Sequence, residues 1–395
     1  MNKSNCSLTC IAVAIAYYLA ASLGLALAFE QVNTSPVWPP TGISIAAVLF
    51  YGYKVWPGIF IGALLINITA GSPLSLATPI AVGNTFEALI AGCLMVRYAS
   101  KYPFRRITNT AAFIIIVVIS TTVSATIGVT SLFVHQIATP ENYTLLWETW
   151  WLGDLVGGLV ITPLLLTWAR TPKAIYAQHR LFELSGLITL SLALSALIFI
   201  EFSPHTGKHN LLIFTLLPIV TWSAIRFQHH GATLLVFLLT AAAIIGTLSG
   251  HGPFIMATEN ESLLLLQATV GTTAITALIL STSTQERQKA NDLLQTAQQD
   301  LESQVMLRTE ELHSTNNQLQ DELTRQALSS KAFKALLNTT KASSYDNFFQ
   351  QCTKELSAAY KARHALIGIY TDHNKNSITT LAVWSNNYSV DNFTY

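Results

Sequence analysis

Charged residues are scarce in this chain: they make up 11% of its 395 residues, whereas 51% are hydrophobic. Soluble domains usually contain about 25% charged residues, and the mean hydropathy here is clearly positive, at +0.42. The shortage excludes a wholly soluble protein and predicts that at least one domain lies in a membrane. The charges that exist are concentrated after residue 282, so two compositions share one chain.

Signatures of catalysis are also missing. The sequence contains no glycine-rich phosphate loop and no nucleophile elbow, and its ten histidines are dispersed. The four cysteines show neither paired metal spacing nor a disulfide framework; they are Cys6, Cys10, Cys93 and Cys352. We therefore predict a chain that can receive and transmit a signal without a catalytic output domain, and with no cofactor, metal or nucleic-acid partner.

Long apolar segments fill the first 282 residues. A membrane span needs about 20 mostly apolar residues. The second and third segments are short and could be half-spans or one tilted hairpin, so we predict an all-α polytopic membrane helix bundle of 8 to 10 spans in the lipid bilayer. The segments are residues 9–29, 41–53, 55–69, 78–96, 108–134, 152–168, 184–200, 211–225, 232–248 and 262–282.

Positive charge indicates the topology, because Lys and Arg concentrate in cytoplasmic loops. With ten spans and the amino terminus inside, Lys208 is the one cation placed outside. His229-His230 lies in an inside loop beside Arg226, and we interpret it as a topology determinant. Both termini are therefore predicted to be cytoplasmic. The inside residues are Lys3, Lys54, Arg97, Lys101, Arg105, Arg106, Arg170, Lys173, Arg180, Arg226, Arg287 and Lys289.

A proline-rich turn separates the first two segments, with the sequence Ser35-Pro36-Val37-Trp38-Pro39-Pro40-Thr41-Gly42. Proline lacks the amide proton of a helix and restricts the residue before it, so a break in the helix is predicted here. Irregular backbone cannot face lipid, and the charge pattern places this turn on the outer side. Trp38 and Pro39 are our candidates for contact with a ligand or signal.

Two carboxylates lie within the predicted spans, Glu87 and Asp154. Ionisable residues in a membrane are costly and are functional candidates by default. Each should face the bundle interior and accept a hydrogen bond, from Asn67, Asn84, Thr41 or the indoles of Trp38 and Trp151. Two interpretations stay open. Either the acids line a polar sensing pocket beneath the turn, with Trp38, Pro39, Asn84, Glu87, Trp151 and Asp154 as site residues, or they lock helices together while Trp150 and Trp151 are interface aromatics.

Glycines recur within the same segments and predict close packing between spans. The residues concerned are Gly58, Gly62, Gly153, Gly157 and Gly158.

Beyond residue 282 a polar helix with isolated apolar residues is predicted for residues 283–330. Leu301, Val305, Arg308, Leu312, Thr315, Leu319 and Glu322 alternate spacings of four and three, which is typical of a coiled-coil seam. The polar members weaken the seam, as would suit a helix that changes register. A homodimer through Leu301, Val305, Leu312 and Leu319 is our prediction, and a solvated linker helix is the alternative.

The last part, residues 331–395, shows a globular pattern. Phe348, Cys352, Leu356 and Tyr360 have helical spacing, residues 365–370 and 378–384 are strand candidates, and residues 372–376 form a polar turn between them. Because about 65 residues bury little core, we expect a domain that is cut short.

Several of these blocks together resemble the bacterial membrane-associated sensor (MASE) family, first subtype. The resemblance covers residues 9–282 and rests on the proline-rich turn, Trp56-Pro57-Gly58, Gly83-Asn84 with Glu87, Trp151-Leu152-Gly153-Asp154 with Gly157 and Pro163, and Trp222 with Arg226. Residues 301–319 resemble signalling helices, and residues from 331 resemble the start of a GAF domain.

The resemblance implies a sensory input module of a bacterial inner-membrane protein of the histidine kinase or diguanylate cyclase type, for an unknown small ligand or membrane partner. A secondary transporter or channel with a regulatory tail is the main alternative, since broken spans with midplane polar residues are typical of it. A scaffold that tethers a partner is a third possibility.

Overall fold

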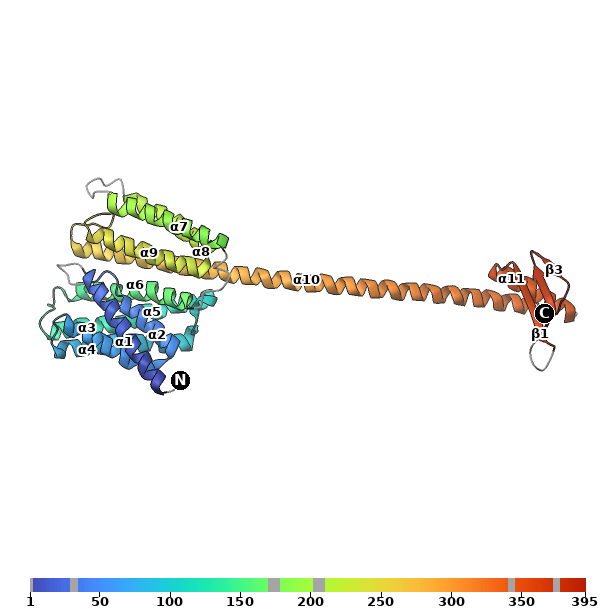
Figure 1. Cartoon of the computed structure of the whole chain (residues 1–395), viewed down its shortest axis with the longest axis horizontal. Helices are drawn as coiled ribbons and strands as arrows, with labels where there is room; N and C mark the ends of the chain where they lie inside the picture. The colour runs from blue at the N-terminus through green and yellow to red at the C-terminus, as the bar shows by residue number, and fades with distance from the viewer. Residues whose placement is uncertain (1–2, 29–34, 170–177, 202–209, 340–344, 372–376) are drawn as a thin grey trace. The chain divides into compact units, whose positions relative to one another are not determined.

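The computed structural model describes residues 3–28, 35–169, 178–201, 210–339, 345–371 and 377–395. The chain forms two compact units, Met1–Asp292 and Leu293–Tyr395. Helices packed side by side form the first unit (Figure 1). They are α1 (Lys3–Ala26), α2 (Pro39–Tyr51), α3 (Trp56–Thr69), α4 (Leu74–Leu94), α5 (Ile107–Val134), α6 (Tyr143–Trp168), α7 (Gln178–Ala196), α8 (Leu216–Arg226), α9 (Gln228–Leu248) and the start of α10 (Glu259–Thr339).

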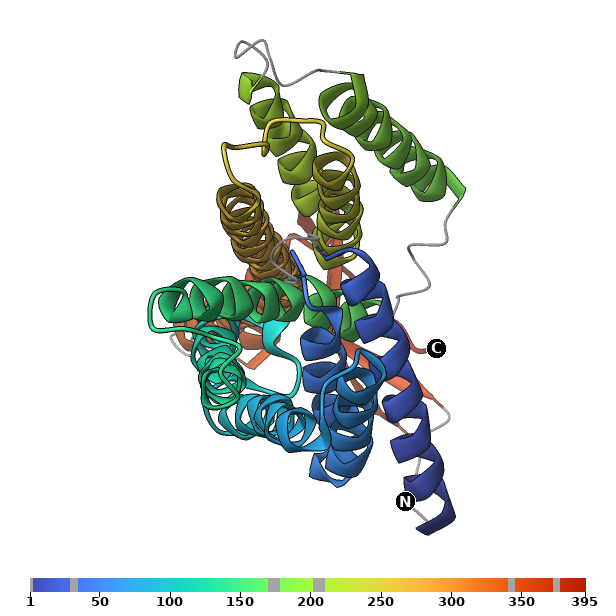
Figure 2. The ribbon, with the colours of Figure 1, turned by 90° about the vertical axis from the view of Figure 1, so that its left-hand side faces the viewer.

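Two groups of helices make up this first unit. Figure 2, which views the bundle along its helices, shows α1 to α6 on one side and α7 to α9 with the start of α10 on the other. Helix α6 joins the groups, because it packs on α2 and α5 and also on α9. One apolar core accordingly contains residues of α2, α5, α6, α9 and α10, and a second lies between α1, α2, α3 and α4.

Each of the ten predicted apolar segments corresponds to a helix, so the prediction of a helical membrane bundle is confirmed. Among the described residues, seven helices are long and apolar enough to cross a membrane: α1, α4, α5, α6, α7, α9 and the start of α10. Three shorter apolar helices cover Pro39–Tyr51, Tyr53–Thr69 and Ile213–Arg226. The short second and third segments of the sequence are therefore α2 and α3.

Two predicted helix boundaries were wrong. Helix α2 starts at Pro39 and not at residue 41, because proline is tolerated in the first turn, where an amide proton has no helical partner. The break is thus confined to residues before Pro39. Helix α6 begins at Tyr143, whereas the apolar segment of the sequence began at residue 152. Its tryptophans pack along α5, and this tertiary contact extends the helix beyond its apolar stretch.

Glycines let neighbouring helices approach closely, as predicted. A Cβ added at Gly157 of α6 would lie 2.0 Å from the carbonyl oxygen of Trp38, and one at Gly58 of α3 would lie 2.3 Å from that of Cys10. For Gly62 and Gly158 the nearest atoms, in Tyr17 and Val117, are at 2.8 and 2.6 Å. Gly153 is less crowded, at 3.2 Å from the carbonyl oxygen of Ser35.

The second unit holds the end of α10, helix α11 (Tyr345–Tyr360) and a small antiparallel sheet. Strand β1 (His364–Tyr370) pairs with β2 (Ile378–Ser385), and β2 pairs with β3 (Tyr388–Val390). The predicted helix and two strands are confirmed, whereas β3 was missed because it has only three residues. The predicted turn at residues 372–376 lies outside the described residues. Helix α10 itself extends to Thr339, into the part that was expected to be globular.

Candidate functional site

The two predicted acids meet inside the first unit. Glu87 of α4 is 1% exposed and Asp154 of α6 is fully buried. The Thr41 hydroxyl of α2 donates a hydrogen bond to Oδ1 of Asp154 at 3.0 Å, which confirms one of the donors proposed from the sequence. Both carboxyls lie beside the hydroxyls of Thr41 and Ser124. Four helices, α2, α4, α5 and α6, therefore converge on one carboxyl pair.

Neither carboxyl is fully satisfied. Oε1 of Glu87 and Oδ2 of Asp154 are buried and have no hydrogen-bond partner in the part of the chain that the structure describes. Asn84, one turn before Glu87, instead accepts a hydrogen bond from Ser124 at 2.7 Å. Among the described residues, neither acid forms an ion pair, and no group of three or more His, Cys, Asp or Glu side chains could hold a metal ion. Because burial opposes an unpaired charge, the pair is suited to hold a proton or to accept a donor from a small ligand.

The proline-rich turn lies directly against this pair. The Trp38 amide donates to the Gly153 carbonyl at 3.0 Å, and Gly157 meets the Trp38 carbonyl one turn further along α6. Inside the turn, the Ser35 hydroxyl donates to the Val37 carbonyl at 2.6 Å. Tyr17 of α1 is 1% exposed and lies next to the Trp38 indole and both acids. The turn and α1 thus close one end of the site.

Not every predicted residue joins the site. Trp38, Asn84, Glu87 and Asp154 come together, and Pro39 is the half-buried first residue of α2. The Trp151 indole donates to the Val118 carbonyl at 3.2 Å and its ring stacks on Trp147, so it binds α6 to α5. Asn67 donates to the Ala63 carbonyl of its own helix.

A residue that the sequence analysis missed links the site to α10. Gln267 of α10 is fully buried, and its Nε2 donates to the Thr149 carbonyl of α6 at 3.2 Å. The same nitrogen would lie 3.4 Å from a Cβ at Gly153, the residue that receives the Trp38 amide. Oε1 of Gln267 has no hydrogen-bond partner. Helix α10 is therefore in contact with the part of α6 that holds Asp154.

A second group of polar contacts holds α10 roughly 16 helical turns before its end at Thr339. We call it the exit cluster: Phe104, Thr110, His229, Ser281 and Thr282. His229, 5% exposed, places Nε2 at 2.7 Å from the Phe104 carbonyl and Nδ1 at 2.8 Å from the Ser281 hydroxyl. Since a carbonyl only accepts, Nε2 carries a proton and donates it to the Phe104 carbonyl. Thr110 and Thr282 are joined at 2.9 Å.

The exit cluster joins α10 to both groups of helices. Phe104 and Thr110 come from η3 (Pro103–Arg105) and α5, whereas His229 comes from α9. Nearby, Glu286 of α10 accepts the amide of Ile107 at 3.0 Å, so a carboxylate stabilises the start of α5. Three segments that the charge pattern placed inside, near residues 105, 226 and 287, therefore lie together.

The sequence contained a signal for both missed contacts. Gln267 is an amide inside an otherwise apolar stretch, but the search for polar groups within spans considered only ionisable side chains. His229 is next to Arg226 in the sequence, and its position in a basic loop suggested a role in topology. Which partner each side chain finds depends on helices that are far away in the chain.

Comparison with known proteins identifies the first unit. The family model MASE1 matches residues 9–288. The chain belongs to the MASE1 family. MASE1 domains are membrane sensory domains, and the matched range includes the carboxyl pair, the Gln267 contact and the whole exit cluster. The expected resemblance is thereby confirmed for the membrane unit.

One relative adds an indication of context for this MASE1 domain. The probable diguanylate cyclase DgcE of Escherichia coli (strain K12) is 24% identical over 265 residues, which are 64% of this chain and 22% of the relative. The chain therefore covers less than a quarter of that relative's length. No solved structure matches the chain.

Proposed function

We propose that this chain is the input part of a bacterial inner-membrane signal-transduction protein of the diguanylate cyclase or histidine kinase type. The observation that carries the proposal is helix α10. It contacts α6 beside the carboxyl pair through Gln267, leaves the bundle at the exit cluster, and continues without interruption to Thr339. The similarity to a probable diguanylate cyclase favours the cyclase type.

The carboxyl pair is proposed as the sensing element. Two unpaired carboxyl oxygens, on Glu87 and Asp154, lie under the Trp38 turn, where a proton or a small ligand with hydrogen-bond donors would satisfy them. Binding would change the contact between the turn and α6. Because Gln267 contacts α6 at the same level, α10 would experience that change. A signal of this kind requires only two helix arrangements that differ by a few kcal/mol.

Dimerisation through α10 is the proposed means of transmission. The seam residues Leu301, Val305, Leu312 and Leu319 are between 57% and 69% exposed, so an apolar stripe is available to a second copy. Exposed Leu294 and Phe333 continue the same alternation of three and four, which extends the stripe in both directions.

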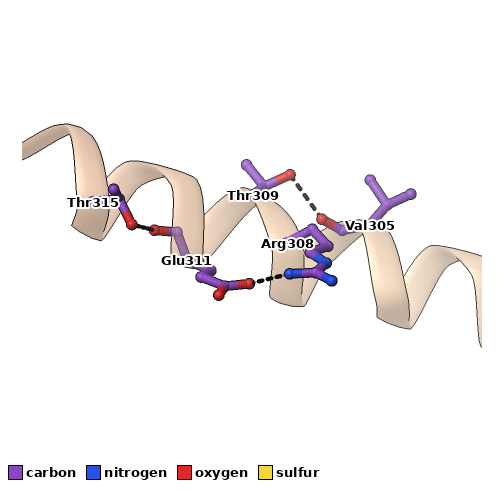
Figure 3. A network of polar contacts seen from close by, with 5 residues as sticks. All are labelled: Val305, Arg308, Thr309, Glu311 and Thr315. Atoms are coloured by element: carbon purple, nitrogen blue, oxygen red, sulfur yellow. Dashed lines mark hydrogen bonds and ion pairs between the residues drawn. The ribbon is translucent and has the colours of Figure 1, made fainter.

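Two polar members of the seam, Arg308 and Thr315, have partners within their own helix (Figure 3). Arg308 pairs with Glu311 at 2.6 Å, and the Thr315 hydroxyl donates to the Glu311 carbonyl. An exposed ion pair of this kind contributes about 1 kcal/mol or less. These residues therefore gain little from a partner, and the resulting dimer would be weak enough to change register.

The proposed topology has both termini in the cytoplasm and ten membrane segments, which include the short helices α2 and α3. The Trp38 turn and Phe50 lie at opposite ends of α2, about 18 Å apart for a helix of that length. Lys101 Nζ donates to the Phe50 carbonyl at 3.3 Å, at the other end of α2 from the turn, which supports the proposal that the turn and the predicted inside residues lie on opposite sides of the membrane. Residues 331–395 would form the start of a GAF-like domain.

Substitution of the acids tests the sensing role. In a variant without the native cysteines, Leu301→Cys allows two copies of the chain to form a disulfide in bacterial membranes. The rate of this crosslinking measures how close the two seams lie. We expect Asp154→Asn and Glu87→Gln to change the rate of crosslinking about fivefold or more, since coupling between sites is typically worth 1–3 kcal/mol. Glu148→Gln, an exposed change on the same helix as Asp154, is the matched control and should leave the rate unchanged. Equal rates in all variants would contradict a sensing role for the pair.

The transporter alternative is separated by a second measurement on the same proteins. Proteoliposomes that contain a pH-sensitive dye report proton flux, because buried carboxyls are typical of proton pathways. Flux that depends on Glu87 or Asp154, together with crosslinking that does not, would favour transport over sensing.

Gln267→Leu tests the link to α10. Leucine removes one hydrogen bond but also an unpartnered buried oxygen, so we expect the free energy of unfolding to change by less than about 1 kcal/mol. The effect of Asp154→Asn on crosslinking should nevertheless disappear in the double variant. Gln304→Leu, an exposed change further along α10, should preserve that effect. If Asp154→Asn acts equally in both backgrounds, the signal does not pass through Gln267.

A further inference from the structure

A cavity lies between α8, α9 and α10, and neither member of the carboxyl pair lines it. It has a volume of about 330 Å³ and is enclosed by residues of η5 (Leu197–Glu201), η6 (Asn210–Thr215), α8, α9 and α10. Its volume is within the range of small-molecule sites. On α10 it is lined by five residues that follow Gln267: Ala268, Thr269, Val270, Thr272 and Thr273.

The chemistry of the lining selects an apolar occupant. Among the described residues, no charged side chain lines the cavity, and the hydroxyls that line it belong to four threonines. Each of the four donates its proton to a carbonyl of its own helix: Thr240 to Val236, Thr269 to Leu265, Thr272 to Ala268 and Thr273 to Thr269. A polar ligand would thus lose hydrogen bonds to water and find no free donor. Apolar cavities of this kind also exclude water.

One end of the cavity is closed and the other faces the bilayer. The closed end is formed by Phe199 and Phe254, which are both buried and stack with ring centroids 5.8 Å apart. Phe199 belongs to a π-helical turn, a feature that is frequent at functional sites. Phe214 and Leu217, which also line the cavity, are 61% and 42% exposed, on an apolar helix of membrane type. Hydrocarbon from the membrane can therefore enter.

We propose that this cavity binds the acyl chain of a membrane lipid and holds it against residues 268–273 of α10. An acyl chain in this position fills the space between α8, α9 and α10. It contacts α10 from Ala268, the residue after Gln267, which contacts α6. The proposal concerns a different site from the carboxyl pair, and it is independent of the proposed sensing role.

Photolabelling of the full chain tests the proposal. The protein is placed in vesicles of phosphatidylethanolamine and phosphatidylglycerol with a palmitic acid that carries a diazirine in mid-chain, and labelled residues are mapped by mass spectrometry. We expect saturable labelling of the cavity faces of α8, α9 and α10, with competition by unlabelled palmitic acid. Labelling that rises linearly with the probe, and is not competed, would overturn the proposal because it indicates general contact with lipid.

A matched pair of variants sharpens the test. Thr273→Leu places extra methyl groups in the cavity and should reduce cavity labelling about tenfold, which corresponds to roughly 1.4 kcal/mol. Thr276→Leu makes the same change one turn further along α10, at an exposed position outside the cavity, and should leave labelling unchanged. Ala243→Leu fills the cavity from α9 and replaces Thr273→Leu if that variant fails to fold. Equal labelling in all variants, or crosslinks from cavity residues to a second copy of the chain in place of the probe, would overturn the proposal.

Discussion

Gly157→Ala should lower the free energy of unfolding in detergent by about 3 kcal/mol or more, at the upper end of what overpacking costs. The added methyl carbon would lie 2.0 Å from the Trp38 carbonyl oxygen and 2.7 Å from its carbon, and both atoms are backbone. A side chain could rotate away, but here the whole turn must move. The Trp38 amide would then lose its bond to the Gly153 carbonyl, and the carboxyl pair would lose its cover.

Two other glycines provide controls for this result. Gly186 in α7 has no atom within 4 Å of an added Cβ, so Gly186→Ala should be neutral or should stabilise the helix by about 0.5–1 kcal/mol. Gly158→Ala meets side chains and no backbone, the nearest atom being in Val117 at 2.6 Å, and should have an intermediate effect. Thermal unfolding of the three glycine variants measures the order of their stabilities. If Gly157→Ala destabilises the protein no more than Gly158→Ala does, the turn does not approach α6 as closely as described.

The second large effect is expected at the exit cluster. His229→Ala removes both ring hydrogen bonds, leaves a buried void and leaves the Phe104 carbonyl without its donor. We therefore expect the free energy of unfolding to fall by roughly 2–4 kcal/mol. Because the ring joins α9 to η3 and to α10, the membrane end of α10 should also become accessible. Reaction of a Thr282→Cys variant with a thiol reagent measures this exposure.

Ser281→Ala shows whether the two side chains act as a unit. Alone, this substitution should lower the free energy of unfolding by about 1 kcal/mol. Combined with His229→Ala it should lower it little further, because the hydrogen bond between the two side chains is already lost. His251→Ala, in the loop before α10, is the control for histidine loss and should change stability by less than about 0.5 kcal/mol. Strict additivity of the His229 and Ser281 effects would show that the hydrogen bond between them contributes nothing.

The membrane bundle was predictable because its signals are local. Each helix follows from a run of apolar residues, and the break before α2 follows from the proline-rich sequence ending at Trp38. The glycine contacts were predicted as a class, since a residue without a side chain in a span is useful mainly where another backbone comes near. The residues that these glycines contact, such as Trp38 for Gly157, were not predicted.

Parts of the candidate site were predictable for a related reason. A carboxylate within a span must avoid lipid, so the burial of Glu87 and Asp154 could be expected from sequence alone. Their pairing could not, because they are 67 positions apart in the chain and lie on α4 and α6. Trp151 shows the converse: its neighbours in sequence suggested the site, whereas the turn of α6 directs its indole to α5.

By itself, the sequence determined that this chain forms a helical membrane bundle followed by a polar helix, and it singled out the turn at Trp38 and the two acids. Only the tertiary structure decided that Gln267 and His229 connect α10 to that bundle, and that an apolar cavity lies against the next turn of the same helix. The reason is physical. Hydrophobicity and proline act on a few consecutive residues, whereas a buried amide or imidazole is defined by the carbonyl it meets across another helix.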